Sequence, residues 1–109
     1  MSVSFQFSVL SKPLMAIALI ASFASTQVLA AGSVAEGKSK AAACGACHGQ
    51  AGISANPMWP NLAGQKDAYL LKQMRDFKSG TRKDPVMSGM AMILNDKDME
   101  NLAAYYSSL

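Results

Sequence analysis

Segments in which apolar residues recur at helical spacing alternate along this chain with segments rich in glycine and proline. Apolar residues three, four and seven positions apart form one face of an amphipathic helix. This spacing predicts helices over Val34–Ala46, over Lys66–Ser79 and in a third segment that follows Asn95. No segment shows the strict alternation of apolar and polar residues that is typical of a half-buried strand. The pattern therefore predicts an all-α fold.

The expected helices differ in the face that they would bury. The first presents a narrow strip of small residues, because Gly37, Ala41 and Cys44 fall at i, i+4 and i+7. Glycine costs a helix about 1 kcal/mol relative to alanine, so we expect Gly37 to permit the close approach of another helix. The other two helices carry larger apolar residues: Leu70, Leu71, Met74 and Phe77 in the second, and Met99, Leu102, Ala103 and Tyr106 in the third.

Capping and breaking residues indicate where the helices begin and end. Gly80 is expected to end the second helix. Asn95 and Asp98 form a variant capping box at the start of the third helix. The intervening segments, Gly49–Gly64 and Thr81–Leu94, contain both proline and glycine. We expect both of them to be irregular loops.

The N-terminal part of the chain carries the pattern of a secretory signal peptide. Lys12 supplies a positive charge ahead of an apolar run, Leu14–Ala24. Val28 and Ala30 then place small residues at the positions that precede a cleavage site. The apolar run is shorter than the roughly 20 residues that span a bilayer, which favours a cleaved leader over an uncleaved membrane anchor. We therefore expect residues 1–30 to be removed.

Cleavage after Ala30 would leave residues 31–109 as one small domain in the periplasm, with no stable membrane span. Cores of this size supply about 3–5 kcal/mol and usually need a metal, a disulfide or another staple. We therefore expect any bound cofactor to be part of the core, and the chain without it to be largely unfolded.

Charge gives little evidence for a nucleic-acid partner. The formal net charge of the whole chain is +3, and no basic stripe with interleaved aromatic residues occurs. The exposed cations are either ordinary solvated charges or groups that steer protein partners. Those that are candidates for the second role are Lys66, Lys72, Lys78, Arg82 and Lys83.

Both cysteines and the single histidine of the chain lie in one pentapeptide, Cys44-Gly45-Ala46-Cys47-His48. Cys-x-x-Cys-His is the attachment motif of c-type haem, in which two thiols add to the porphyrin and the imidazole ligates the iron. A thioredoxin-like pair would need a βαβ context, a zinc site would need a fourth ligand, and a short-loop disulfide is the remaining alternative. We expect one haem c, covalently bound through Cys44 and Cys47 and ligated by His48.

The iron of such a haem has a sixth coordination position, for which the sequence offers no second histidine. Thioether sulfur is a soft donor that raises the reduction potential, so methionine is the natural candidate. The methionines of the expected domain are Met58, Met74, Met87, Met90, Met92 and Met99. Two of them lie on apolar helix faces, and the first follows the histidine too closely to reach the opposite face. In the second loop, Met87 is favoured over Met90, because Pro85 fixes the backbone before it and Gly89 lets the chain turn after it; the residues alone leave both open.

The sequence resembles a class I cytochrome c, and closely resembles one haem domain of the two-haem cytochrome c4 family. The matching stretches cover nearly all of the expected domain: Cys44-Gly45-Ala46-Cys47-His48-Gly49, Pro60-Asn61-Leu62-Ala63-Gly64-Gln65, Tyr69-Leu70-Leu71-Lys72-Gln73, Met87-Ser88-Gly89-Met90 and Ala103-Ala104-Tyr105-Tyr106. The resemblance implies a class I cytochrome c fold, with three main helices and two loops wrapped around one covalently bound haem.

The resemblance also implies roles for single residues. Met87 would be the axial ligand, and the carbonyl of Pro60 would accept the ring N–H of His48, which fixes the imidazole tautomer. Gly37 would cross against Tyr105. The family carries two such domains in one chain, so this chain is expected to be a one-haem relative or one subunit of a larger assembly.

Together these features predict a soluble periplasmic electron carrier rather than an enzyme. It would exchange single electrons with protein donors and acceptors, as a monomer or a weak dimer. One alternative is a cytochrome subunit bound permanently to a periplasmic dehydrogenase. Another is a gas-binding or peroxidatic haem protein, although the c-type gas binders carry their motif near the C-terminus.

Overall fold

The computed structural model describes residues 31–109, so the expected signal peptide lies outside the described residues. This part of the chain forms the helices α1 (Val34–Lys40), α2 (Ala42–His48), α3 (Asp67–Ser79), α4 (Met87–Met92) and α5 (Asp96–Ser107). Residues 31–109 contain no strand, which confirms the all-α prediction. Within the same residues, no helix has the length and apolar character needed to cross a membrane.

The first predicted helix is in fact two helices, α1 and α2, that meet at Ala41. The prediction of one helix was wrong at the bend and also at the end, since α2 continues to His48. The Ala41 N–H is shared between the carbonyls of Gly37 and Lys38, at 2.9 and 3.3 Å, and such sharing tightens the last turn of a helix. The Gly45 N–H still bonds to the Ala41 carbonyl at 2.9 Å, so α2 follows α1 directly. The attachment pentapeptide therefore lies within a helix.

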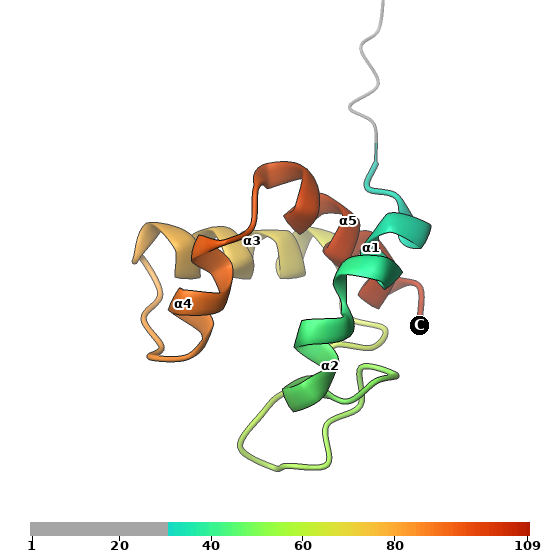
Figure 1. Cartoon of the computed structure of the whole chain (residues 1–109), viewed down its shortest axis with the longest axis horizontal. Coiled ribbons are helices and arrows are strands. Elements are labelled where there is room, and N and C mark those ends of the chain that lie inside the picture. Colours follow the sequence, from blue (N-terminus) through green and yellow to red (C-terminus); the bar gives the residue numbers. More distant parts are fainter. Residues whose placement is uncertain (1–30) are drawn as a thin grey trace, which may run out of the picture.

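Helix α1 crosses α5 at a point where the two backbones touch (Figure 1). A Cβ at Gly37 would lie 1.9 Å from the carbonyl oxygen of Asn101 and 2.7 Å from the Cβ of Tyr105. Only glycine fits there, which confirms the predicted close approach. The buried Asn101 side chain ties the helices together: its Nδ2 donates to Glu36 Oε2 at 2.7 Å, and its Oδ1 accepts the Ser33 N–H at 2.7 Å. The crossing positions α2 at the far end of α1.

Helix α5 supplies most of the core and begins as predicted. The Asp98 N–H donates to Asn95 Oδ1 at 2.7 Å, and the Asn95 N–H donates to Asp98 Oδ2 at 3.2 Å, which completes the capping box. Helix α3 packs against α5 and ends at Gly80, whose φ of 79° is left-handed, as expected of a terminating glycine. The buried residues that pack together in the core come from α3, from α5 and from the junction of α1 and α2: Leu70, Leu102, Ala103, Tyr105, Tyr106 and Ala41.

Of the two segments predicted to be irregular loops, one is irregular and the other contains a helix. The segment over residues 49–64 contains no helix or strand, as predicted. The second contains α4, so the prediction of an entirely irregular segment was wrong. Helical hydrogen bonding begins early in it, since the Ser88 N–H bonds to the Asp84 carbonyl and the Met90 N–H to the Val86 carbonyl, both at 3.0 Å. A helix this short is unstable alone; it persists here because Ala91 is fully buried and because α4 packs beside α3 (Figure 1).

Candidate haem site

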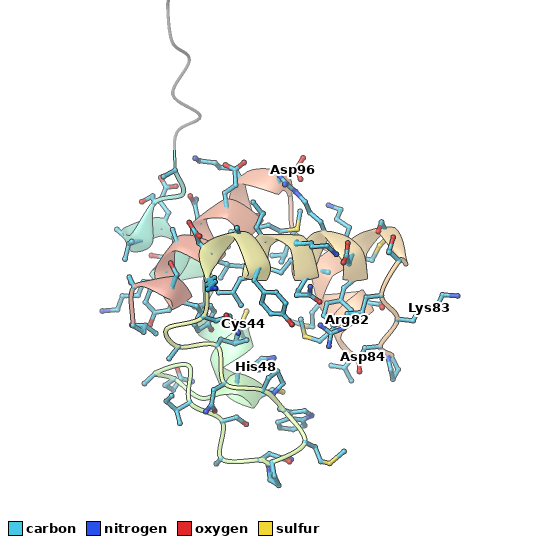
Figure 2. All side chains as sticks on the ribbon, turned by 180° about the vertical axis from the view of Figure 1, so that it is seen from behind. Cys44, His48, Arg82, Lys83, Asp84 and Asp96 are labelled. Atoms are coloured by element: carbon cyan, nitrogen blue, oxygen red, sulfur yellow. The ribbon has the colours of Figure 1, made fainter. Side chains whose placement is uncertain are left out.

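A cavity of about 560 Å³ lies between α2 with its following loop and the elements α3 and α4. All five residues singled out from the sequence line this cavity: Cys44, Cys47, His48, Pro60 and Met87. Figure 2 shows Cys44 and His48 at one side of the gap, and Arg82 and Asp84 at the other. The volume falls in the range of about 300–1,000 Å³ that is typical of cofactor pockets.

The wall of this cavity is mostly apolar. Such a wall excludes water and lowers the local dielectric constant, so charges inside it interact strongly. The apolar lining comes from the loop after α2, from α3 and α5, and from the segments on either side of α4: Trp59, Leu62, Leu70, Met74, Phe77, Val86, Ile93, Leu94 and Leu102. The cavity is therefore suited to a large, flat and mainly apolar group.

The two cysteines lie on the same face of α2. Cys44 and Cys47 are three positions apart in a helix, so their side chains are neighbours along one face, and both line the cavity. Both are free and half-buried, so the structure does not contain the short-loop disulfide considered from the sequence. Burial raises the pKa of the Cys44 thiol, and a hydrogen bond with the Tyr106 side chain offsets part of that effect. Between residues 31 and 109, no group of three or more His, Cys, Asp or Glu side chains is placed to hold a metal ion.

His48 ends α2 and is buried, with 7% of its surface exposed. Its Nδ1 lies 2.8 Å from the carbonyl oxygen of Pro60. A carbonyl can only accept, so Nδ1 carries the proton and donates it, which leaves the lone pair on Nε2. A histidine held in this way is oriented and polarised as a metal ligand.

The structure narrows the choice of a methionine ligand. Met92 and Met99 do not line the cavity, and Met99 is core, with 1% of its surface exposed. Met58 is 83% exposed and lies in the same loop as Pro60, hence on the His48 side. The cavity-lining methionines from the other side are Met74, which packs against the core, and Met87 and Met90 on α4. The geometry therefore agrees with the two candidates that the sequence left open.

Residues at the N-terminal end of α4 form part of the same wall. Asp84 lines the cavity, and its carboxylate accepts the backbone N–H groups of Met87 and Val86. These two hydrogen bonds, that of Met87 first, lower the pKa of Asp84. This aspartate was not among the predicted site residues, although an Asp-Pro pair one turn before a methionine is a helix-start signal that could have revealed it.

Two further cavity residues were not assigned to the site from the sequence. Tyr106 was expected only as part of an apolar helix face, yet it lines the cavity, and burial raises its pKa. Arg82 stacks on Phe77, with its guanidinium carbon 4.5 Å from the ring centroid, and donates to Gln73 Oε1 at 2.5 Å. Neither placement could be predicted from residue spacing. That of Tyr106 depends on how α3 and α5 pack, and that of Arg82 depends on how the chain turns back against α3.

The surface cations proposed for partner steering are not equivalent. Lys72 pairs with Asp76 one helical turn away, and the Lys78 ammonium donates to the carbonyl of Leu94. Both therefore have local structural partners. Arg82 faces the cavity, as described above. The remaining two, Lys66 and Lys83, are exposed.

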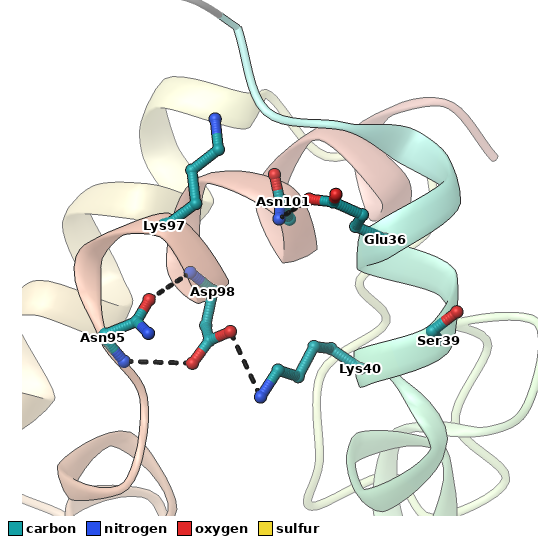
Figure 3. A pocket seen from close by; sticks show the side chains of 7 residues that line it. All are labelled: Glu36, Ser39, Lys40, Asn95, Lys97, Asp98 and Asn101. Carbon is teal, nitrogen blue, oxygen red and sulfur yellow. Dashed lines mark hydrogen bonds and ion pairs between the residues drawn. The ribbon is translucent and has the colours of Figure 1, made fainter.

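A second hollow of about 500 Å³ lies between α1 and α5, and its lining is polar (Figure 3). Lys40 Nζ lies 3.1 Å from Asp98 Oδ1, and Asp98 also belongs to the α5 capping box. Asn101 bonds to Glu36 across the same hollow. Since these groups already satisfy one another, we interpret this hollow as part of the α1–α5 interface and the apolar cavity as the candidate functional site.

Comparison with known sequences identifies a protein family that this chain matches. The family model described as "Cytochrome c" matches residues 34–109. Cytochrome c4 of Pseudomonas aeruginosa is 52% identical to this chain over 79 residues, in a match that covers 72% of this chain and 39% of that protein. The chain thus spans about two fifths of the length of this relative. Cytochrome c-554(548) of Halomonas halodenitrificans is 42% identical, and the match covers 72% of this chain and 98% of that relative.

Comparison with solved structures gives the same family resemblance. The chain superimposes on the crystal structure of reduced recombinant cytochrome c4 from Pseudomonas stutzeri with a TM-score of 0.68 and 47% sequence identity. The match covers 72% of this chain and 46% of that chain. The fold expected from the resemblance is therefore confirmed.

Proposed function

This chain belongs to the cytochrome c family, and we propose from this that it carries single electrons between protein partners in the periplasm through a haem ligated by His48 and Met87. Family membership implies one covalently bound haem c, and Cys44 and Cys47 are the two thiols of the chain. The observation that carries the proposal is the convergence of the pentapeptide and the α4 methionines on one apolar cavity. When bound, the haem supplies reversible one-electron exchange at its iron.

On the α2 side, the two cysteines and the histidine of the pentapeptide have different roles. Cys44 and Cys47 present two thiols on one helix face, which suits two covalent links to one flat group. His48 offers Nε2 to the iron because Pro60 holds its Nδ1–H. All of these groups belong to α2 or to the loop that follows it.

On the α4 side, Met87 offers a thioether sulfur. A soft sulfur ligand favours the ferrous state, and an apolar wall disfavours the additional positive charge of the ferric state. Both effects raise the reduction potential. Met87 is the first residue of α4, a short helix that packs beside α3.

We further propose that the protein is exported to the periplasm. Residues 1–30 have the charged start, the apolar run and the small residues of a cleaved leader. Mass spectrometry of the haem-containing protein purified from a periplasmic fraction tests this. The expected mass corresponds to a chain that begins at Ala31 and carries one haem, and a mass that includes residues 1–30 would contradict it.

The first experiment is the visible absorption spectrum of the mature protein, oxidised and reduced, before and after the addition of carbon monoxide. A low-spin c-type spectrum that the gas does not change indicates a closed iron with two protein ligands, as proposed. A high-spin spectrum, or a clear change on adding the gas, would indicate an open sixth position. The gas-binding or peroxidatic function would then be favoured.

The choice of ligand is tested by a pair of matched variants. Met87→Ala is expected to open the iron to carbon monoxide and to lower the reduction potential, whereas Met90→Ala is expected to leave both unchanged. Both substitutions remove one methionine from the same cavity wall, so general loosening of α4 would affect them alike. The reverse pattern would assign the ligand to Met90.

Purification and size-exclusion chromatography of the same protein distinguish a free carrier from an enzyme subunit. A carrier is expected to elute from a sizing column as a monomer or a weak dimer, with its haem in place. Stable co-purification with a flavin or molybdenum protein would instead favour the dehydrogenase subunit considered from the sequence.

A further inference from the structure

The backbone at the entrance to α4 is held by one aspartate. Asp84 Oδ1 accepts the N–H of Met87 at 2.7 Å and that of Val86 at 2.9 Å. These are N–H groups of a first helical turn, which have no partner within the helix. Aspartate is among the best residues for satisfying them, and loss of such a cap costs a helix more stability than most surface substitutions.

The hydrogen bonds around this turn form a closed ring. The Asp84 N–H donates to Ser88 Oγ at 3.2 Å, while the Ser88 N–H donates to the Asp84 carbonyl at 3.0 Å. Pro85 lies inside the ring and before the start of α4, where a residue without an N–H removes no helical hydrogen bond. Met87 therefore lies between Asp84 and Ser88, which bond to each other. Its own N–H donates to the Asp84 carboxylate.

The remainder of α4 is held by different contacts. Ala91 is fully buried near its C-terminal end, and Leu94 beyond it accepts a hydrogen bond from Lys78. The N-terminal turn has no comparable buried residue, since Val86 is 61% exposed and Met87 is half-buried. The ring centred on Asp84 is thus what holds the turn that carries the Met87 side chain.

We propose that Asp84 is a positioning residue for the Met87 ligand, and that its hydrogen bonds set how readily the Met87 sulfur leaves the iron. This inference rests on the proposed His48 and Met87 ligation. Without the ring, the turn can unwind while α4 stays anchored at Ala91, and the sulfur moves away from the cavity. Any small donor that competes for the iron then binds more tightly.

The test uses the oxidised haem-containing protein and titration with imidazole, which competes with the methionine for the sixth position. Binding is followed by the loss of the methionine–iron charge-transfer band. Asp84→Ala is expected to tighten apparent imidazole binding roughly tenfold, as expected from loss of a helix cap. Asp84→Asn keeps an acceptor oxygen and is expected to remain within about twofold of the wild type.

The matched control is Asp98→Ala, which removes a side-chain acceptor at the start of α5, outside the cavity lining. It should lower global stability without changing imidazole binding. If Asp84→Ala does not yield haem-containing protein, Ser88→Ala removes only the reciprocal bond and should tighten imidazole binding about two- to threefold.

The possible outcomes distinguish failure of the Met87 ligand assignment from failure of the positioning role of Asp84. If the wild-type protein has no displaceable methionine, the ligand assignment fails and the positioning role fails with it. If the wild type has methionine ligation that Met87→Ala abolishes, yet neither Asp84→Ala nor Ser88→Ala changes imidazole binding, only the positioning role is overturned. Equal tightening by Asp98→Ala would also overturn it, because the effect would then be general loosening.

Discussion

The Nδ1 of His48 lies 2.8 Å from the carbonyl oxygen of Pro60, twelve residues further along the chain. The loop that contains Pro60 folds back on itself, since the N–H groups of Leu62 and Ala63, just after Pro60, both bond to the Gly52 carbonyl, at 2.8 and 3.0 Å. The irregular loop therefore has a defined task. It delivers one carbonyl to the ring of His48 and so determines which nitrogen faces the cavity.

Freeing the backbone at Pro60 should loosen this hydrogen bond. Pro60→Gly keeps the carbonyl but releases φ, which adds conformational freedom worth about 0.4–1 kcal/mol. We expect the His48 ring N–H to exchange with solvent several-fold faster, as measured by NMR of the haem-containing protein. Pro57→Gly is the matched control, because Pro57 is exposed in the same loop and is not among the residues that line the cavity. Equal exchange rates in the two variants would mean that the proline does not position its carbonyl.

Some of the site was predictable from the sequence because it is local. The cysteines and His48 lie within five residues, and their roles follow from residue type and spacing alone. The capping box at Asn95 was equally local. Pro60 was assigned only through the family resemblance, since nothing in its neighbourhood distinguishes it from an ordinary turn proline.

Other features of the fold depend on tertiary packing, which cannot be predicted from the periodicity of apolar residues. Helix α4 has six residues, contains Gly89 and closely follows Pro85, so its sequence favours a loop. It is helical because Ala91 is buried and Asp84 caps its first turn. The bend at Ala41 was missed for a similar reason, because a shared N–H leaves no mark on the residue pattern.

Replacement of Gly37 should weaken the α1–α5 crossing. The added Cβ of Gly37→Ala would meet a backbone carbonyl at 1.9 Å and the Tyr105 Cβ at 2.7 Å, neither of which can rotate away. We expect a loss of about 1–3 kcal/mol in the free energy of unfolding, measured by denaturant titration of the haem-containing protein.

The control for that measurement is Gly89→Ala in α4. An added Cβ there meets nothing within 4 Å, and the residue is helical. Alanine is the better helix former, so this variant should be more stable by about 0.5–1 kcal/mol. Opposite signs for the two substitutions are the expected result, and a loss in both would point to a general effect of the methyl group.

The Asp98 carboxylate should make stability depend on pH in the acid range. Its pKa lies below the ordinary aspartate value of about 4, chiefly because it accepts the Asn95 N–H and also because Lys40 is close. The folded state thus binds protons less readily than the unfolded state does. The stabilisation is fully present above the unfolded pKa and is lost as pH falls through the folded pKa.

Comparison with Asp98→Asn measures this contribution, because asparagine keeps the acceptor oxygen and removes the charge. The wild type should be the more stable protein at pH 6, by denaturant titration. The difference should shrink as the pH is lowered from about 5 to about 3. A difference that stays constant over that range would show that the charge of Asp98 contributes nothing.

Loss of the haem should unfold most of the chain. Among the larger side chains of residues 31–109, only Met99 and Leu102 have less than 2% of their surface exposed, and a cavity of about 560 Å³ separates α2 from α3 and α4. Burial on this scale does not offset the conformational entropy of a domain this small. The double variant Cys44→Ala with Cys47→Ala, which cannot attach haem, is therefore expected to lose most of its far-ultraviolet helix signal.

Met87→Ala is the matched control for this experiment, since it alters the same cavity but keeps both covalent tethers and should keep the helix signal. Native helix content in the haem-free double variant would have a specific meaning. The α1–α5 crossing at Gly37 and the packing of α3 on α5 would then suffice to fold the chain. The haem would enter a preformed cavity instead of completing the core, and the apolar wall would be held open by the helices themselves.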